Sequence, residues 1–196
     1  MSTFNPDEIS QLIRYRRSNY PAQYSGERID RKIIEEILEN ANWAPTHKIS
    51  EPWRFTVFTG EGLKKLSEFT SELYREVTTI KGTFDERKFK KLTSKPLLAS
   101  HVISIGMKRD EKERIPEIEE IESVACAVQN MQLTATAYGL GCYWSSGGIT
   151  YYEEAKSFFG LGTKDKLLGF MFLGYPKSKW PKSKRKPIEH KVNWVE

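Results

Sequence analysis

The chain has 196 residues, of which 38% are hydrophobic and 29% charged, and its formal net charge is +5. This length suits one domain spanning residues 1–196, and the balance of apolar and charged residues excludes wholesale disorder. The two cysteines, Cys126 and Cys142, form neither a C-x-x-C pair nor a cluster with histidine, so no structural zinc or disulfide framework is predicted. We expect a cytoplasmic location, because this cysteine usage suits a reducing compartment and the first residues lack the features of a signal peptide.

The positive charge is concentrated near the C-terminus. Six basic residues and no acidic ones lie between Lys177 and Pro187, and in the remainder acidic residues outnumber basic ones by one. One interpretation is a nucleic-acid-binding module, in which this run contacts phosphates and Trp180 stacks on bases. The near-neutral remainder argues against it, and the uncharged stretch from Ser123 to Tyr152 is too polar to cross a membrane. We therefore expect neither nucleic acid nor membrane as a partner.

Helical periodicity dominates the first part of the chain. The pattern predicts a first helix from Asn5-Pro6 to near Arg17-Ser18, because asparagine followed by proline is typical of a helix start. A loop is expected from Pro21 to Arg28. A second helix is expected to begin at its cap, Asp30, and to stop at Pro45.

The rest of the chain mixes strand and helix patterns. Strands rich in aromatic and β-branched residues are predicted over Trp53–Thr59, Leu97–Met107, Gly141–Ser146 and Leu167–Leu173. Helices are predicted over Glu61–Lys91 with an interruption near Gly82, from Pro116 to Gly139, and over Tyr151–Phe159. Few strands, many helices and no regular βαβ alternation predict an α+β domain.

The tail from Lys177 to Glu196 is poor in apolar residues until its end, where Val192, Trp194 and Val195 occur. An isolated tail would not leave these side chains in water. We infer that the tail wraps over a neighbouring surface, either of this chain or of another subunit.

Motifs for catalysis by side chains are absent. The chain contains no G-x-S-x-G, no H-E-x-x-H, no Walker loop and no dinucleotide-binding glycine motif after a strand. The histidines His47, His101 and His190 have no spacing that makes a metal site, and mid-helix Cys126 is expected to be a buried, inert thiol. An enzyme built from this chain would therefore take its reactivity from a bound cofactor, with no metal and no catalytic side chain.

The first candidate binding segment is Arg16, Arg17 and Ser18. Two guanidinium groups beside a hydroxyl suit a phosphate and its neighbouring polyol, because arginine presents rigid paired donors. Taken alone, these residues fit a plainer interpretation better, in which the cations complement the dipole at the end of a helix.

The second candidate segment runs from Trp43 to His47 and continues to Pro52-Trp53, where a strand starts. A helix that breaks at a proline and continues as a short polar loop is a favoured place for binding groups. The alternative is a capped turn, with Trp53 as a core anchor. Trp53 is assigned mainly to the core. For His47, a binding role and a place in a capped turn are equally open.

The third candidate segment runs from Gly139 to Gly148 and includes Trp144, Ser145 and Ser146. Closely spaced glycines let the backbone approach a planar ring, whose polar edge the amides and hydroxyls can bind. A tight turn without a ligand would have a similar sequence, so this segment alone is a weak signal.

Together, and in this order, the motifs resemble the nitroreductase family. They are R-R-S at 16–18, A-P-x-H at 44–47, P-W-R-F at 52–55, G-L-G-x-x-W-S-S-G at 139–147, L-G-Y-P at 173–176 and R-K-P at 185–187. The histidine of the A-P-x-H motif is similar to the small YdjA-like branch of that family. The resemblance covers almost the whole chain, from Arg16 to Pro187.

The resemblance implies an α+β fold with a central, mostly antiparallel sheet flanked by helices, and a homodimer with two FMN sites at its interface. The C-terminal tail would extend over the partner subunit. By position, Arg16, Arg17 and Ser18 would hold the phosphate and ribityl chain, and Trp43 and His47 would approach the flavin from the partner. Trp144, Ser145 and Ser146 would line the isoalloxazine ring, and Arg185 or Lys184 would reach the phosphate from the tail.

The implied activity is hydride transfer from NADH or NADPH through FMN to a small acceptor, such as a nitroaromatic or a quinone, in a ping-pong cycle. The chain departs from the YdjA-like branch at Ser145 and Trp43, where that branch carries arginines, and in its tail. These departures bear on the charge of the acceptor pocket. The alternatives are a flavin-binding protein of the same fold with a specialised reductive role or no turnover, and the nucleic-acid-binding module.

Overall fold

A four-stranded antiparallel sheet forms the centre of the molecule. The computed structural model describes residues 4–178, 180 and 182–196, so Lys179 and Pro181 of the predicted tail lie outside the described residues. The strand order is β1-β2-β4-β3, with β1 at Trp53–Thr59, β2 at His101–Met107, β3 at Gly141–Ser145 and β4 at Lys166–Gly174. The α+β class and the antiparallel sheet expected from the sequence are confirmed.

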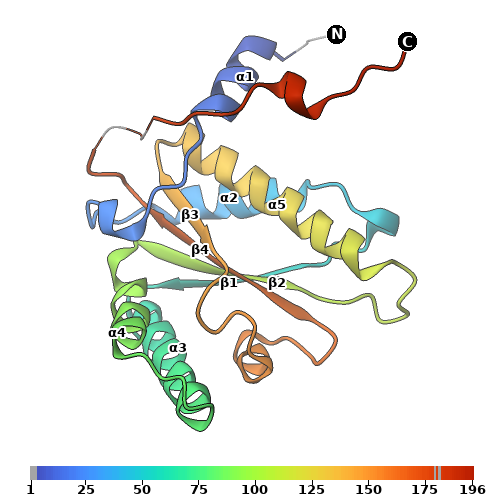
Figure 1. Cartoon of the computed structure of the whole chain (residues 1–196). Coiled ribbons are helices and arrows are strands. Elements are labelled where there is room, and N and C mark those ends of the chain that lie inside the picture. The colour runs from blue at the N-terminus through green and yellow to red at the C-terminus, as the bar shows by residue number, and fades with distance from the viewer. Residues whose placement is uncertain (1–3, 179, 181) are drawn as a thin grey trace.

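Helices cover both faces of this sheet (Figure 1). One face carries α2 (Arg31–Asn42) and α5 (Glu117–Ala137), and the other carries α3 (Glu61–Ile80), α4 (Glu86–Ser94) and the 3-10 segment Glu153–Phe159. Side chains alternate along each strand, so Ile103 and Met171 join the apolar cluster under α2 and α5, whereas Phe170 and Phe172 join the cluster under α3. The sheet is therefore buried on both sides.

Local sequence signals set most helix boundaries. The Asn5 side chain accepts a hydrogen bond from the Asp7 amide at 3.0 Å to cap α1 (Pro6–Tyr15), and Asp30 caps α2 through the Lys32 amide at 2.8 Å. The interruption predicted near Gly82 is also confirmed, because Gly82 takes a left-handed φ of 65° between α3 and α4.

Two predicted elements differ in the structure. The strand expected from Leu97 starts instead at His101, because Pro96–Leu98 form a 3-10 turn closed by the Ala99 amide on the Pro96 carbonyl. The helix expected over Tyr151–Phe159 is a 3-10 segment, Glu153–Phe159, that ends at Gly160 with a φ of 68°. The side chains of this segment still pack on the sheet, although a 3-10 helix has fewer residues per turn than an α-helix.

The expectation of a buried Cys126 is wrong, because Cys126 is exposed in the chain. Helix α5 contacts the sheet through Val124, Ala127, Val128 and Met131, which turns residue 126 to the opposite face. In contrast, Cys142 on β3 is buried, and burial raises the pKa of its thiol to about 12. A mid-helix position predicts burial poorly when only one face of the helix packs.

Helix α1 and the C-terminal tail lie outside the two layers, next to each other (Figure 1). The ring of Trp180 stands 5.1 Å from the ring of Tyr15, and no residue of α1 is buried. Within the described part of the chain, no helix is both long and apolar enough to span a bilayer.

Candidate functional site

The R-R-S segment lies directly alongside β3. The Arg16 amide donates to the Leu12 carbonyl at 3.0 Å and ends α1, after which Ser18 forms an isolated parallel bridge with Cys142. The Asn19 amide donates to the Cys142 carbonyl at 2.9 Å. The structure thus brings the first and third candidate segments together, although they are more than 120 residues apart in the chain.

Glycine makes this close approach possible. A Cβ atom added to Gly141 would lie 2.9 Å from the Cβ atom of Asn19, and also 2.9 Å from the ring of Tyr24. The Tyr24 hydroxyl donates to the Asn19 carbonyl at 2.7 Å and lies 3.0 Å from the Phe172 carbonyl of β4. Backbone and ring contacts therefore fix the position of the segment that follows Arg16 and Arg17.

Two polar atoms in this segment are buried without a hydrogen-bond partner among the described residues: Nε of Arg17 and Oδ1 of Asn19. Arg17 also donates through Nη1 to the carbonyl oxygens of Arg14 and Arg16, so in the single chain it caps the end of α1. An unpaired donor and an unpaired acceptor two residues apart in the chain match a ligand with anionic oxygens and hydroxyl groups. The residues present thus fit a phosphorylated polyol.

The glycine-serine turn, residues 139–148, makes a side-chain contact that none of the sequence motifs includes. Lys95, between α4 and β2, donates from Nζ to Ser145 Oγ at 2.9 Å. The same Nζ lies 4.7 Å from the ring centroid of Tyr143 and 4.4 Å from that of Phe172. Burial, followed by repulsion from Lys91, lowers the pKa of Lys95 to about 8. The packing of the end of α4 against β3 brings Lys95 to Ser145, so no local motif marks it.

Trp144 faces away from Ser145. Its Nε1 donates at 3.0 Å to the carbonyl of Leu168, the residue bulged out of the β2–β4 pairing. Gly169 adjoins this bulge with a φ of 123°, and a Cβ atom there would lie 2.4 Å from the Ser145 carbonyl oxygen. Trp144 and Ser146 line a hollow of about 390 Å³ beside α5. The three residues predicted to line one ring therefore belong to two faces of the turn.

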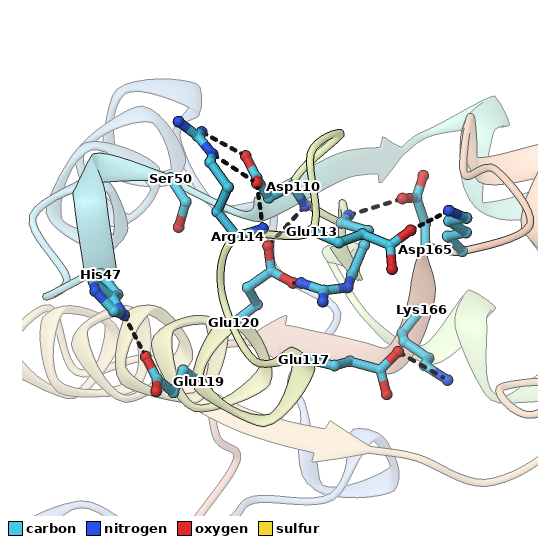
Figure 2. Close-up of polar contacts among 12 residues, drawn as sticks. His47, Ser50, Asp110, Glu113, Arg114, Glu117, Glu119, Glu120, Asp165 and Lys166 are labelled. Carbon is cyan, nitrogen blue, oxygen red and sulfur yellow. Dashed lines mark hydrogen bonds and ion pairs between the residues drawn. The ribbon is translucent and has the colours of Figure 1, made fainter.

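Trp43 and His47 lie apart from these segments in the single chain. Trp43 is 79% exposed and donates from its indole to Glu39 Oε1 at 3.0 Å. His47 Nδ1 is 2.6 Å from Glu119 Oε2 at the start of α5 (Figure 2). The loop that carries His47 has positive φ values at Lys48 and Glu51, both non-glycine residues. Among the described residues of the single chain, no hydrogen bond or ion pair links this loop to Arg16 or Ser145.

The loop between β2 and α5 is held by a buried ion pair (Figure 2). The Glu120 side chain is fully buried, accepts from the Asp110 amide at 2.7 Å and pairs with Arg109. The Arg109 amide in turn donates to Asp165 at 2.9 Å. These contacts fix the start of α5, and with it the carboxylate of Glu119 that holds His47.

The tail residues Lys184 and Arg185 are exposed, and within the described residues no hydrogen bond or ion pair joins them to the R-R-S segment. Arg185 Nη1 donates to the Ser183 hydroxyl and to the Lys184 carbonyl, the latter at 3.0 Å. Among the described residues, the hydrogen bonds of Arg185 are thus with its own neighbours in the chain. Across residues 4–178, 180 and 182–196 no cluster of three metal-ligating side chains occurs.

Comparison with known proteins is consistent with this arrangement. The model of the nitroreductase family matches residues 13–175. The chain is 34% identical over 146 residues, which cover 74% of it and 77% of the relative, to YdjA of Escherichia coli (strain K12), which carries the name of an NAD(P)H nitroreductase. A solved nitroreductase-like family protein from Bacillus cereus is 30% identical with a TM-score of 0.80, covering 100% of this chain and 99% of that one.

A second solved structure is similar in fold alone. It is the FMN-dependent nitroreductase NfnB of Mycobacterium smegmatis in complex with NADPH. The TM-score is 0.74 at 15% identity, and the match covers 97% of this chain and 99% of that chain.

Proposed function

The chain belongs to the nitroreductase family, and we propose that it is a homodimeric enzyme that uses FMN to transfer hydride from NADH or NADPH to a small acceptor. The acceptor is a nitroaromatic, a quinone or a similar reducible molecule. The observation that carries the proposal is the bridge between Ser18 and Cys142, which joins the R-R-S segment to the glycine-serine turn. A cytoplasmic location is part of the same proposal.

The flavin site is assigned along β3. Arg16, Arg17 and Ser18 would bind the phosphate end, where the unpaired Arg17 Nε needs an acceptor and the unpaired Asn19 Oδ1 needs a donor. The hydroxyl of Ser145 and the ammonium group of Lys95, 2.9 Å apart, would bind the polar edge of the ring. Trp144 and Ser146 would border the ring from the α5 side.

When bound, FMN supplies the hydride chemistry that no side chain of this chain can provide. The protein positions the two substrates in turn at one place, which predicts ping-pong kinetics. The charge of Lys95 would stabilise negative charge at the edge of the ring, and its partial burial strengthens that effect. No side chain is assigned as a general acid.

A second copy of the chain would complete the site. Ile9 and Ile13 of α1 are about half exposed, and Ile118 of α5 is exposed on the surface turned away from the sheet. Exposed apolar side chains on surface helices are typical of an interface between subunits. In such a dimer Trp43 and His47 would approach the partner's flavin, and the tail with Arg185 or Lys184 would extend over the partner.

The visible absorption spectrum of the purified protein tests the proposal. We expect a yellow protein that bleaches on anaerobic addition of NADH or NADPH and regains its colour with a nitroaromatic or a quinone. The Arg16→Ala variant should lose its FMN during purification, whereas a fully yellow variant would count against the role of Arg16. A colourless monomer that stays colourless with excess FMN would reject the proposal.

The runner-up function is a flavin-binding protein of the same fold without general turnover, or with a specialised reductive role. It predicts a yellow protein that does not oxidise NADH or NADPH in the presence of simple nitro compounds. The nucleic-acid-binding module predicts a colourless protein with salt-sensitive binding to DNA or RNA, so one preparation distinguishes all three.

A further inference from the structure

A cavity of about 310 Å³ adjoins the glycine-serine turn on the side of α3 and α4. Its walls are mostly apolar and include Leu66 of α3, Leu92 of α4, and Phe170 and Phe172 of β4. Small-molecule sites span roughly 300–1,000 Å³, so this cavity suits a molecule of one or two rings and is too small for a whole flavin nucleotide. The turn itself forms one wall through residues 147–149.

The charge around this cavity has one sign. Lys88, Lys91 and Lys95 line it, and no carboxylate does. Lys95 is engaged with Ser145, whereas Lys88 and Lys91 have no carboxylate within 4.0 Å among the described residues. In contrast, Lys90 lies on the same helix but not on the cavity, and it pairs with Glu86 at 3.5 Å. Unpaired cations thus lie on the side of α4 that faces the cavity.

We propose that the acceptor is an aromatic molecule with an anionic group, whose ring enters this cavity and whose charge is bound by Lys88 and Lys91. The inference rests on the proposed function, because it identifies the molecule that is reduced at the flavin. The apolar walls accept the ring, and the two exposed ammonium groups at the rim bind a carboxylate without being desolvated.

The reaction balances for 4-nitrobenzoate. One NADH and one proton from solvent supply two electrons and two protons, which convert the nitro group to a nitroso group and release water. NADH becomes NAD⁺, and the carboxylate takes no part in bond making or breaking. It serves only as the group that Lys88 and Lys91 bind.

The test compares 4-nitrobenzoate with 4-nitrobenzamide, which are similar in shape and differ by one charge. We expect kcat/KM to favour the anion by about fivefold, because an ion pair between the carboxylate and exposed lysines is weak. In the double variant Lys88→Gln, Lys91→Gln the ratio of the two kcat/KM values should fall to about one, because the charge that distinguishes the acceptors is removed. The matched control, Lys90→Gln on the same helix, should retain the preference for the anion.

Binding of benzoate gives a readout without turnover, because benzoate cannot be reduced. By calorimetry on the FMN-containing protein, benzoate should bind the wild type about fivefold more tightly than the double variant, and less tightly as salt increases. Equal kcat/KM for the two acceptors, with equal benzoate affinity in wild type and double variant, would overturn the inference in a protein that is still yellow. A colourless protein that oxidises no nicotinamide nucleotide would overturn the proposed function as well.

Discussion

The hydroxyl of Tyr24 joins the proposed phosphate-binding segment to the sheet. It is placed between the carbonyls of Asn19 and Phe172, and Tyr24 is only 3% exposed. The change Tyr24→Phe preserves the ring, which packs on Gly141 and Gly174, and removes only the donor. A buried acceptor that loses its partner costs about 1–3 kcal/mol. The free energy of unfolding should therefore fall by that amount.

Thermal unfolding of the FMN-free protein measures this loss. For a chain of this size each kcal/mol corresponds to roughly 2–4 °C in Tm. The matched control is Tyr138→Phe, because the Tyr138 hydroxyl also makes a hydrogen bond, to Glu36, but on the surface. Surface substitutions of this kind change stability by no more than about 0.5 kcal/mol. Burial raises the pKa of Tyr24 well above its ordinary range, so the difference should not vary from about pH 6 to about pH 9.

The binding of FMN provides the second measurement. Since the Tyr24 hydroxyl holds the Asn19 carbonyl, Tyr24→Phe should also weaken the affinity for FMN, and Tyr138→Phe should not. Equal Tm values for the two variants would refute the argument that this hydroxyl fixes the segment. A lower Tm with unchanged FMN affinity would show that the Tyr24 hydroxyl stabilises the fold but does not contribute to FMN binding.

Four further predictions follow from the contacts of single residues. Gly169→Ala should lower Tm by several degrees and reduce soluble yield, because its Cβ atom would lie 2.4 Å from the Ser145 carbonyl oxygen at a φ of 123°. Glu120→Ala should destabilise the chain by about 3–5 kcal/mol in denaturant unfolding, because it leaves the largely buried Arg109 without its partner. FMN affinity should fall as pH rises through about 8, where Lys95 loses its charge, and Lys95→Met should remove this pH dependence in a fluorescence titration. The lowered pKa also means that the folded chain binds fewer protons than the unfolded chain between about pH 8 and the ordinary lysine value of 10.5, so stability should rise with pH in that window.

Elements governed by local signals were predictable from the sequence. The caps at Asn5 and Asp30, strand β1 and the break at Gly82 depend on the residue at that position and its immediate neighbours. The start of β2 was not predictable from composition, because Leu97 and Leu98 have strand-like side chains but follow Pro96 into a 3-10 turn. There the backbone restriction of one proline outweighs the preference of two apolar residues.

The candidate site divides in the same way. Motif order predicted Arg16–Ser18 and the glycine-serine turn as parts of the site, but their contact depends on the pairing of Ser18 with Cys142, which no local pattern contains. The opposite facing of Trp144 and Ser145 could have been predicted, since neighbouring residues on a strand point to opposite faces. Lys95 could not, because fifty residues separate it from Ser145 and only the packing of the end of α4 against β3 brings them together.

Helix α1 would connect the proposed flavin site to the proposed dimer. It has ten residues, none of them buried, and a helix of that length is marginal in water by itself. Its cap at Asn5 contributes about 1 kcal/mol, which does not offset the cost of ordering the helix. The apolar stripe with Ile9 and Ile13 therefore needs a second surface to cover it, and the end of this helix positions Arg16 and Arg17. A partner subunit that buries α1 would thus order the phosphate-binding end of the flavin site, so dimer formation and FMN binding are expected to strengthen each other by thermodynamic linkage.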